Sequence, residues 1–157
     1  MDRSILYFGR YEGWLRHLAR GVRDNDSECI AKAARLFDLM LPSKCVVVPM
    51  PSCTGSATTM LAVAAKIGGA DRKVFNGLVC NPHESSYSQK KSGRFPRIVN
   101  IVLDNPQILG EDWKSREFYI IDNVVCTGVT AASALEAFRD YGIFNAVVCT
   151  LAKSTWR

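Results

Sequence analysis

Residues 118–130 read FYIIDNVVCTGVT, and this stretch decides the fold of the chain. Its first four residues are large and apolar, which is typical of a strand that is covered on both faces. Asp122 and Asn123 follow at the carboxyl end of that strand, and a short turn with Gly128 leads into a helix predicted over 130–141. A buried strand that passes through a glycine turn into a helix is typical of an α/β protein with a parallel sheet.

Strand and helix alternate on both sides of this stretch. In chain order the sequence predicts a strand at 45–49, a helix at 58–67, strands at 73–79, 98–103 and 118–121, the helix at 130–141 and a strand at 146–151. We therefore expect an α/β fold with an open, mostly parallel, twisted sheet flanked by helices. Ligands bind beyond the carboxyl ends of the strands in such sheets, so the loops at 50–56, 80–97 and 122–130 are expected to surround the site.

One domain is expected from 157 residues and 17.4 kDa. We predict a helical N-terminal segment over 1–43, in which Trp14, Leu15 and Leu18 recur at helical spacing, followed by the core over 44–157. Hydrophobic residues make up 48% of the chain and charged residues 22%, which excludes wholesale disorder. The sequence holds no apolar run that approaches about 18 residues and no secretory signal pattern, so we expect a cytoplasmic protein that does not bind a membrane.

The six cysteines argue against a clustered zinc site. No two of them are separated by only two residues, whereas zinc sites of that class need tight pairs of ligands. We interpret most of them as small buried apolar residues in a reducing compartment. Cys53 and Cys126 differ from the others, because they fall in loops that are expected at the site.

The turn after the 118–121 strand combines the groups that hold a phosphorylated sugar. Free backbone N–H groups at the start of the helix, with the positive end of the helix dipole, favour a phosphate. Gly128 lets the backbone approach closely, and the hydroxyls of Thr127 and Thr130 add hydrogen-bond donors. Asp122 can accept hydrogen bonds from vicinal ribose hydroxyls, or lie near a magnesium ion. The alternative interpretation is an ordinary strand–turn–helix unit with capping threonines.

Residues 118–130 resemble the signature of the type I phosphoribosyltransferase family, which is four apolar residues, two acids, two apolar residues, a variable position and Thr-Gly-x-Thr. The resemblance implies a phosphoribosyltransferase-like fold, 5-phosphoribosyl-1-diphosphate as ligand and Mg²⁺ as cofactor. It implies catalytic roles for Asp122 and Asn123, with Asp122 also a candidate metal ligand. The residues that it assigns to phosphate binding are Cys126, Thr127, Gly128, Val129 and Thr130. Asn123 departs from the pattern, because the family usually has a second acid there, and Cys126 stands where enzymes for 6-oxopurines tend to have an Asp.

A second candidate site follows the strand at 45–49, where the family places its pyrophosphate loop. By this resemblance the loop comprises Ser52, Cys53, Thr54 and Gly55. Its backbone N–H groups and hydroxyls can cradle an anion. The loop has no Lys or Arg, so its hold on a diphosphate would rest on neutral donors, and it lacks the Gly-Lys-Ser/Thr of a P-loop.

Residues 81–97 are predicted to form a long loop, since they hold only two large apolar residues. Over 72–97 six cations stand against one acid, an excess equal to the net charge of +5 for the whole chain. The cations assigned to this flexible basic loop are Lys90, Lys91, Arg94 and Arg97. Such a loop suits closure over a phosphorylated substrate, binding to the backbone of a nucleic acid, or a merely solvated surface.

A narrower resemblance extends over most of the chain. It is carried by YEGWL at 11–15, VPMP at 48–51, SQ at 88–89, RIVN at 97–100 and LAK at 151–153. These stretches are similar to ComF-type competence-associated proteins, which are phosphoribosyltransferase-like and linked to DNA uptake, although their cysteine zinc finger is absent from this sequence. Lys153 is placed like a base-contacting lysine of 6-oxopurine phosphoribosyltransferases, and Trp156 is a candidate for stacking on a base.

These residues lead to two function hypotheses. The first is an enzyme that binds 5-phosphoribosyl-1-diphosphate or a nucleotide and moves ribosyl phosphate to or from a nitrogenous base through an oxocarbenium-like sugar. The second is a non-catalytic protein on the same fold, which senses a phosphoribosyl metabolite or binds single-stranded DNA through 72–97. The intact 127–130 turn favours the first, and Asn123 favours the second. Dimerisation is common in the family, so a homodimer is a further expectation.

Overall fold

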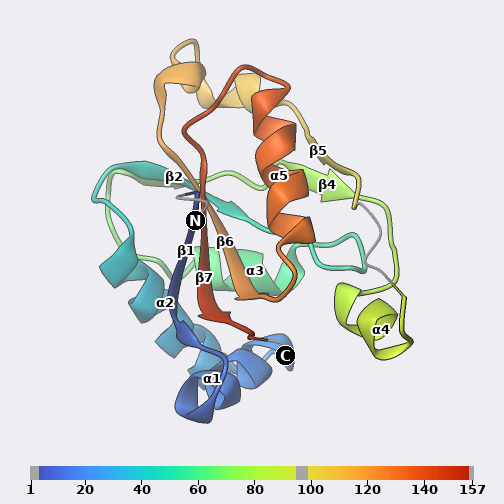
Figure 1. Ribbon diagram of the computed structural model, residues 1–157. Helices are drawn as coiled ribbons and strands as arrows, with labels where there is room; N and C mark the ends of the chain where they lie inside the picture. Colours follow the sequence, from blue (N-terminus) through green and yellow to red (C-terminus); the bar gives the residue numbers. More distant parts are fainter. Residues whose placement is uncertain (1–3, 95–98, 156–157) are drawn as a thin grey trace.

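A five-stranded sheet forms the centre of the molecule (Figure 1). The computed structural model describes residues 4–94 and 99–155. The strands lie in the order β1 (Ile5–Arg10), β7 (Val147–Lys153), β6 (Phe118–Val125), β2 (Cys45–Pro49) and β3 (Arg72–Val74), and each pairs with its neighbours in parallel. A separate antiparallel pair holds β4 (Leu78–Cys80) and β5 (Ile101–Leu103). The predicted α/β fold with an open, mostly parallel sheet is confirmed.

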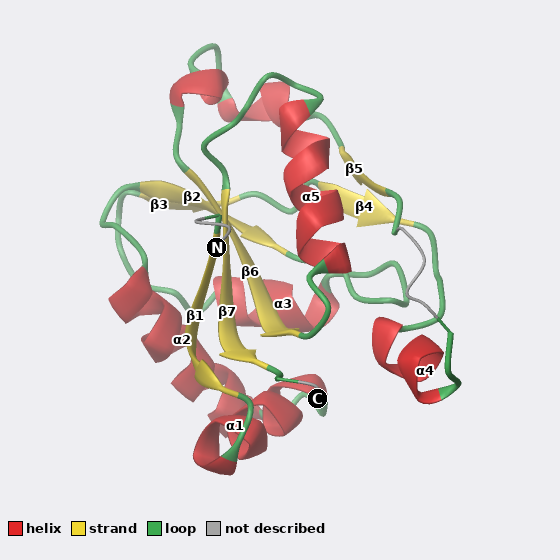
Figure 2. Ribbon diagram, in the orientation of Figure 1, coloured by secondary structure: helices red, strands yellow, loops and turns green. Residues whose placement is uncertain are grey.

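Helices cover both faces of the central sheet (Figure 2). One face packs on α1 (Gly13–Arg23), α2 (Ser27–Met40) and α3 (Thr58–Ala64), and the other on α5 (Val129–Arg139) and the β4–β5 pair. Successive residues of a strand point to opposite faces. Val47 of β2 therefore belongs to the hydrophobic cluster under α1, α2 and α3, and Val48 belongs to the cluster under α5 and the β4–β5 pair. The connections contain α4 (Ser86–Lys91), η1 (Pro106–Leu109) and η2 (Trp113–Ser115). No helix within the described residues is both long and apolar enough to span a bilayer.

The N-terminal segment differs from the helical prediction for 1–43. Helices do fill residues 13–23 and 27–40, but Ile5–Arg10 form the edge strand β1. This strand pairs in parallel with β7, from Ile5 opposite Val148 to Arg10 opposite Lys153. Its partner lies at the other end of the chain, and a six-residue run next to a helical pattern carries no local signal of that pairing.

The region after β2 also departs from the prediction. The predicted strand over 73–79 is divided, because the chain leaves the central sheet after Val74 and resumes at Leu78 in the β4–β5 pair. Gly77 lies within this division, and a Cβ there would collide with the ring of Phe75. The predicted loop over 81–97 contains the short helix α4. The strand predicted over 98–103 begins at a residue outside the described part of the chain, and its described residues include the strand β5.

Strand pairing changes abruptly beside β6. The β2–β6 ladder runs only as far as Pro49 opposite Ile121, where the N–H of Met50 donates to the carbonyl of Ile121 at 2.9 Å. Beyond that point β6 continues to Val125 with β7 as its partner, while the chain after β2 turns away. The carboxyl ends of β2 and β6 are therefore the point at which the sheet opens, which is where ligands bind in such sheets.

Arg72 is a structural residue, although the sequence counts it among the cations of 72–97. Its side chain is only 9% exposed and forms an ion pair with Asp38 of α2. Its guanidinium also donates to the carbonyl oxygens of Leu41 at 2.7 Å, Pro42 at 2.8 Å and Gly68 at 2.9 Å. It thereby satisfies carbonyl groups beyond the end of α2 and fixes the start of β3.

Replacing Arg72 should destabilise the fold without any ligand being involved. We expect Arg72→Ala to lower the free energy of unfolding by about 2–4 kcal/mol, because several half-buried carbonyl groups lose their donor. Urea unfolding followed by circular dichroism measures this change. Lys73→Ala removes a neighbouring exposed cation and is the matched control, with an expected change below about 0.5 kcal/mol. Equal stability of the two variants would contradict the structural role.

Candidate functional site

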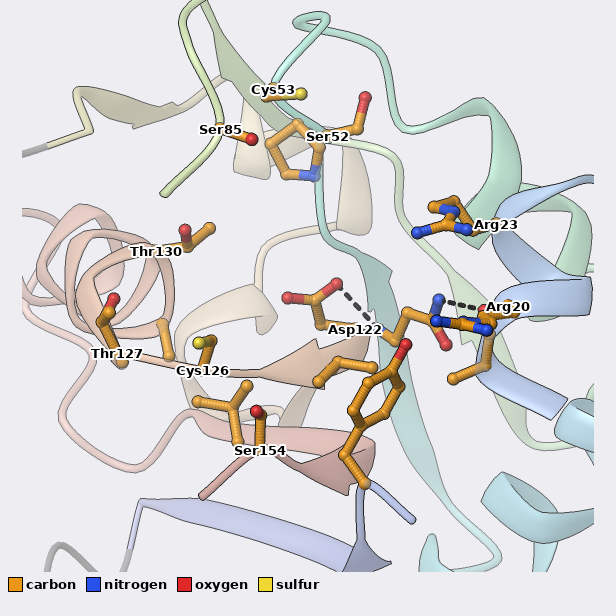
Figure 3. A pocket seen from close by; sticks show the side chains of 18 of the residues that line it. Arg20, Arg23, Ser52, Cys53, Ser85, Asp122, Cys126, Thr127, Thr130 and Ser154 are labelled. Carbon is orange, nitrogen blue, oxygen red and sulfur yellow. Dashed lines mark hydrogen bonds between the residues drawn. The ribbon is translucent and has the colours of Figure 1, made fainter. Parts of the chain in front are cut away.

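A pocket of about 570 Å³ lies at the carboxyl ends of β2 and β6, where the sheet opens. Its walls come from α1, from the loop after β2, from the segment after β4 and from the turn between β6 and α5 (Figure 3). Its described lining residues with polar side chains are Tyr11, Arg16, Arg20, Arg23, Ser52, Cys53, His83, Ser85, Asp122, Asn123, Cys126, Thr127, Thr130 and Ser154. Segments that are distant in the sequence therefore meet around a single cavity.

The start of α5 presents free backbone donors to this pocket. Gly128 precedes the helix with φ of 81°, in the left-handed region that favours glycine, and a Cβ there would meet nothing within 4 Å. The carbonyl of Gly128 accepts from the N–H of Ala132, so the N–H groups of Thr130 and Ala131 come before the first helical hydrogen bond. Thr127, Gly128, Thr130 and Ala131 all line the pocket. This arrangement suits a phosphate.

The other two residues predicted to bind phosphate contribute less directly. Cys126 lines the pocket as a half-buried free thiol. Val129 packs its side chain against the hydrophobic core, and its backbone N–H lies 3.4 Å from Oγ1 of Thr127. The predicted phosphate turn thus faces the cavity through its backbone and two threonine hydroxyls.

Asp122 is the one acid among the described residues that line the pocket. Its carboxylate accepts the backbone N–H of Asn123 at 2.7 Å, and none of the ion pairs among the described residues includes it. Burial disfavours its charged form and raises its pKa to about 6, against the small lowering effect of that hydrogen bond. Asp122 is thus an unpaired acceptor that ionises close to neutral pH.

Asn123 connects β6 to α1 and does not resemble a second catalytic acid. Its amide nitrogen donates to the carbonyl of Ala19 at 2.7 Å, and its Oδ1 atom is buried without a hydrogen-bond partner among the described residues. A carboxylate cannot donate to a carbonyl group, so an acid at this position would lose the bond to α1. The departure from the family pattern therefore has a structural consequence here.

Three arginines that the sequence analysis did not single out line the pocket from α1. They are Arg16, Arg20 and Arg23. Their spacing was a usable signal, because residues at positions i, i+4 and i+7 share one face of a helix. Figure 3 shows Arg20 and Arg23 on one side of Asp122, with Thr127 and Thr130 on the other.

The predicted pyrophosphate loop is largely closed by its own hydrogen bonds. Ser52 and Cys53 line the pocket, whereas Thr54 and Gly55 are not among its lining residues. The N–H of Gly55 donates to the carbonyl of Ser52 at 2.9 Å, and the hydroxyls of Ser52 and Thr54 lie 2.6 Å apart. Gly55 has φ of 86°, and a Cβ there would come within 2.8 Å of the carbonyl oxygen of Cys80. Its role is to pack the loop against β4.

Among the described residues of 81–97, those that reach the pocket lie at the start of the loop. His83 and Ser85 line the cavity, and the N–H of His83 donates to the carbonyl of Cys53 at 2.8 Å. Lys91 is exposed, and Arg94 forms an ion pair with Glu84 at 2.6 Å. Neither cation is among the described lining residues, and the side chain of Lys90 and the whole of Arg97 lie outside the described part of the chain. Closure of this loop over a ligand stays a prediction.

Of the two predicted base-binding residues, Lys153 is not among the described residues that line the cavity. The ammonium group of Lys153 lies 5.4 Å from the centre of the Tyr7 ring, on the edge strand β1. Trp156 lies outside the described residues. Ser154, which follows β7, lines the pocket instead and donates its backbone N–H to the carbonyl of Val125 at 2.9 Å.

The described residues contain no group of three or more His, Cys, Asp and Glu side chains that can hold a metal ion. Magnesium is commonly held by one or two carboxylates together with substrate phosphates and water. Asp122 fits that pattern as a single ligand for an ion that enters with a phosphorylated substrate, whereas the amide nitrogen of Asn123 is engaged with α1.

No protein-family model matches the chain, and no curated protein matches it. Among solved structures, the chain is similar to a purine phosphoribosyltransferase from Pyrococcus horikoshii Ot3, with 14% sequence identity and a TM-score of 0.43. That alignment covers 97% of this chain and 88% of the other. The resemblance to ComF-type proteins stays a prediction.

The raised pKa of Asp122 predicts a pH-dependent cost to stability. Its folded pKa of about 6 lies above the ordinary value of 3.8, so its ionisation destabilises the fold progressively as the pH rises between these values. We expect Asp122→Asn to raise the free energy of unfolding at pH 8 by about 1–3 kcal/mol. The difference should vanish near pH 4, and urea unfolding across this range measures it. A variant that is less stable than wild type at pH 8 would contradict the assignment.

The bond between Asn123 and Ala19 predicts that an acid at position 123 is harmful. We expect Asn123→Asp to lower the free energy of unfolding at pH 8 by about 2–4 kcal/mol, because a carboxylate would face a carbonyl oxygen beside Asp122. The loss should shrink toward pH 5, where a protonated carboxyl can donate again. Asn123→Ala is the matched control, since it removes the donor without adding a charge. An Asn123→Asp loss that does not change with pH would count against this explanation.

Proposed function

We propose that this chain binds a phosphoribosyl ligand, either 5-phosphoribosyl-1-diphosphate or a nucleoside monophosphate, and transfers ribosyl phosphate to or from a nitrogenous base. One observation carries the proposal: the short segment 122–130 sets an unpaired carboxylate and an uncapped helix start on the wall of one pocket. A sugar with adjacent hydroxyls and a phosphate matches both groups.

The two halves of the segment have complementary chemistry. The N–H groups at the start of α5 and the hydroxyls of Thr127 and Thr130 would hold the 5′-phosphate. Asp122 would accept hydrogen bonds from the ribose hydroxyls, because an ionised carboxylate is an acceptor only. The left-handed backbone of Gly128 connects the two parts without a side chain between them.

Transfer at the sugar carbon calls for stabilisation of positive charge rather than for a nucleophile. Asp122 is suited to that role, since it is half-buried on the pocket wall and belongs to no ion pair among the described residues. Its charge is present above a pH of about 6. Magnesium, when bound with a diphosphate, supplies charge neutralisation for the leaving group, and Asp122 is the residue that would hold it.

A second candidate is a non-catalytic protein that senses a phosphoribosyl metabolite. The single acid in the pocket and the engagement of Asn123 with α1 favour it. Binding of single-stranded DNA through 72–97 has less support, because Arg72 is committed to α2 and Arg94 to Glu84.

Isothermal titration calorimetry with 5-phosphoribosyl-1-diphosphate and magnesium chloride tests the proposal. We expect wild-type protein to bind and Gly128→Leu to lose at least about tenfold in affinity, since its side chain would project into the pocket and strain the turn. Gly142→Leu is the matched control. Gly142 lies beyond the other end of α5, has φ of 80° and also meets nothing within 4 Å of a Cβ. The two variants should lose similar stability, but only Gly128→Leu should lose the ligand.

Turnover separates the two candidates. Steady release of diphosphate with one member of a panel of nitrogenous bases supports the enzyme. Tight binding with no turnover for any base supports the sensor. The absence of binding by wild-type protein, or an equal loss of ligand affinity in Gly128→Leu and Gly142→Leu, would overturn the proposed site.

A further inference from the structure

The arginines of α1 form a row on the side of the helix that faces the pocket. Each residue turns an α-helix by about 100°, so Arg16, Arg20 and Arg23 fall within an arc of about 60°. The buried residues of the helix occupy the neighbouring arc, and they are Leu15, Leu18, Ala19 and Val22. All three arginines are exposed, and all three line the cavity.

Within the described residues, the charges of this row are largely unpaired. Arg16 and Arg20 belong to none of the ion pairs among the described residues, and Arg23 has only a 3.4 Å contact with Asp24, in which both side chains are well exposed. Arg72 and Arg94 contrast with Arg16 and Arg20, since each of the former is paired with an acid. The pocket thus holds three cations beside one unpaired carboxylate.

The position of this arginine row is fixed by a hydrogen bond to the backbone of α1. The side-chain amide of Asn123 donates to the carbonyl of Ala19, the residue before Arg20. The middle of α1 is therefore held against β6, the strand that carries Asp122. The carbonyl of Arg20 in turn accepts the N–H of Asp24 at 2.9 Å, at the end of the helix. The guanidinium groups extend from a tethered helix rather than from a loop.

We infer that Arg16, Arg20 and Arg23, which all line the pocket, form a second anion subsite. Figure 3 shows Arg20 and Arg23 across Asp122 from Thr127 and Thr130 at the start of α5. The inference rests on the proposed function and sharpens its ligand class. The pocket would take a sugar that carries two separate phosphoryl groups, one at the α5 end and one, phosphate or diphosphate, at the α1 end. Guanidinium groups recognise phosphoryl oxygens through paired hydrogen bonds. A nucleoside monophosphate offers a neutral base where these cations lie, so a ligand with two anionic ends fits better.

The arginine subsite can hold the second phosphoryl group of the ligand without help from the predicted pyrophosphate loop at 52–55. That loop carries no cation, and several of its donors are already used by its own hydrogen bonds.

Calorimetry with two probes tests the subsite. Ribose 5-phosphate carries one anionic group, and 5-phosphoribosyl-1-diphosphate carries two. We expect wild-type protein to bind the second probe at least about tenfold more tightly in magnesium chloride. In Arg20→Gln/Arg23→Gln this ratio should fall toward one, while the affinity for ribose 5-phosphate stays within about twofold of wild type. Both arginines are exposed, and a urea unfolding curve verifies that the variant remains folded.

Arg35→Gln/Lys44→Gln is the matched control, because both residues are exposed, neither is among the described lining residues, and the change in net charge is the same. In this control variant, the ratio of the affinities for the two probes should equal that of wild type. Two results would overturn the subsite and leave the proposed function standing. In the first, Arg20→Gln/Arg23→Gln binds both probes with the same ratio of affinities as wild type. In the second, the ratio of affinities falls equally in the control variant. No binding of either probe would overturn both. Salt-sensitive binding of single-stranded DNA that needs the two arginines, without selectivity between the probes, would also overturn the subsite.

Discussion

The hydrogen bond from Met50 to the carbonyl of Ile121 closes the β2–β6 ladder, and the site depends on what happens one residue later. Asp122 still belongs to a strand, because β7 pairs with β6 as far as Val125, but its other edge no longer has a strand beside it. A paired strand gives the carboxylate a fixed position, and the open edge gives it a cavity. Neither a fully paired strand nor a free loop would provide both conditions.

The same arrangement imposes a cost that a ligand can offset. Burial raises the pKa of Asp122 to about 6, so keeping it ionised at neutral pH works against folding. Three arginines share its cavity, yet no ion pair among the described residues joins any of them to it. Unpaired charges of both signs around one cavity suit a ligand that supplies hydroxyl donors to the acid and phosphoryl oxygens to the cations. Among the described residues, no ion pair joins these cations to Asp122, so the complementary charges are available to a ligand.

Sequence patterns were informative where one short segment carries both fold and site. Residues 118–130 contain a buried strand, an acid, a left-handed glycine and a helix start, and each of these has a local physical signature. The edge strand β1 was missed because its evidence is its partner β7, at the far end of the chain. The bond from Asn123 to α1 was not predicted, since nothing local to position 123 indicates that α1 presents the carbonyl of Ala19 there. Pairings across such separations are visible only in the folded chain.

The distribution of charge along the sequence also failed to locate the charged site. Counted by segment, the positive excess lies in 72–97, whereas residues 1–43 hold seven cations against six acids and look almost neutral. Folding separates those charges in space. Asp26 turns its carboxylate to the N–H of Cys29 at the start of α2, while the arginines of α1 line the pocket. In 72–97 the opposite occurs, because Arg72 and Arg94 each meet an acid. An electrostatic site is therefore set by which cations the fold gathers around a cavity, and a nearly neutral segment can supply it.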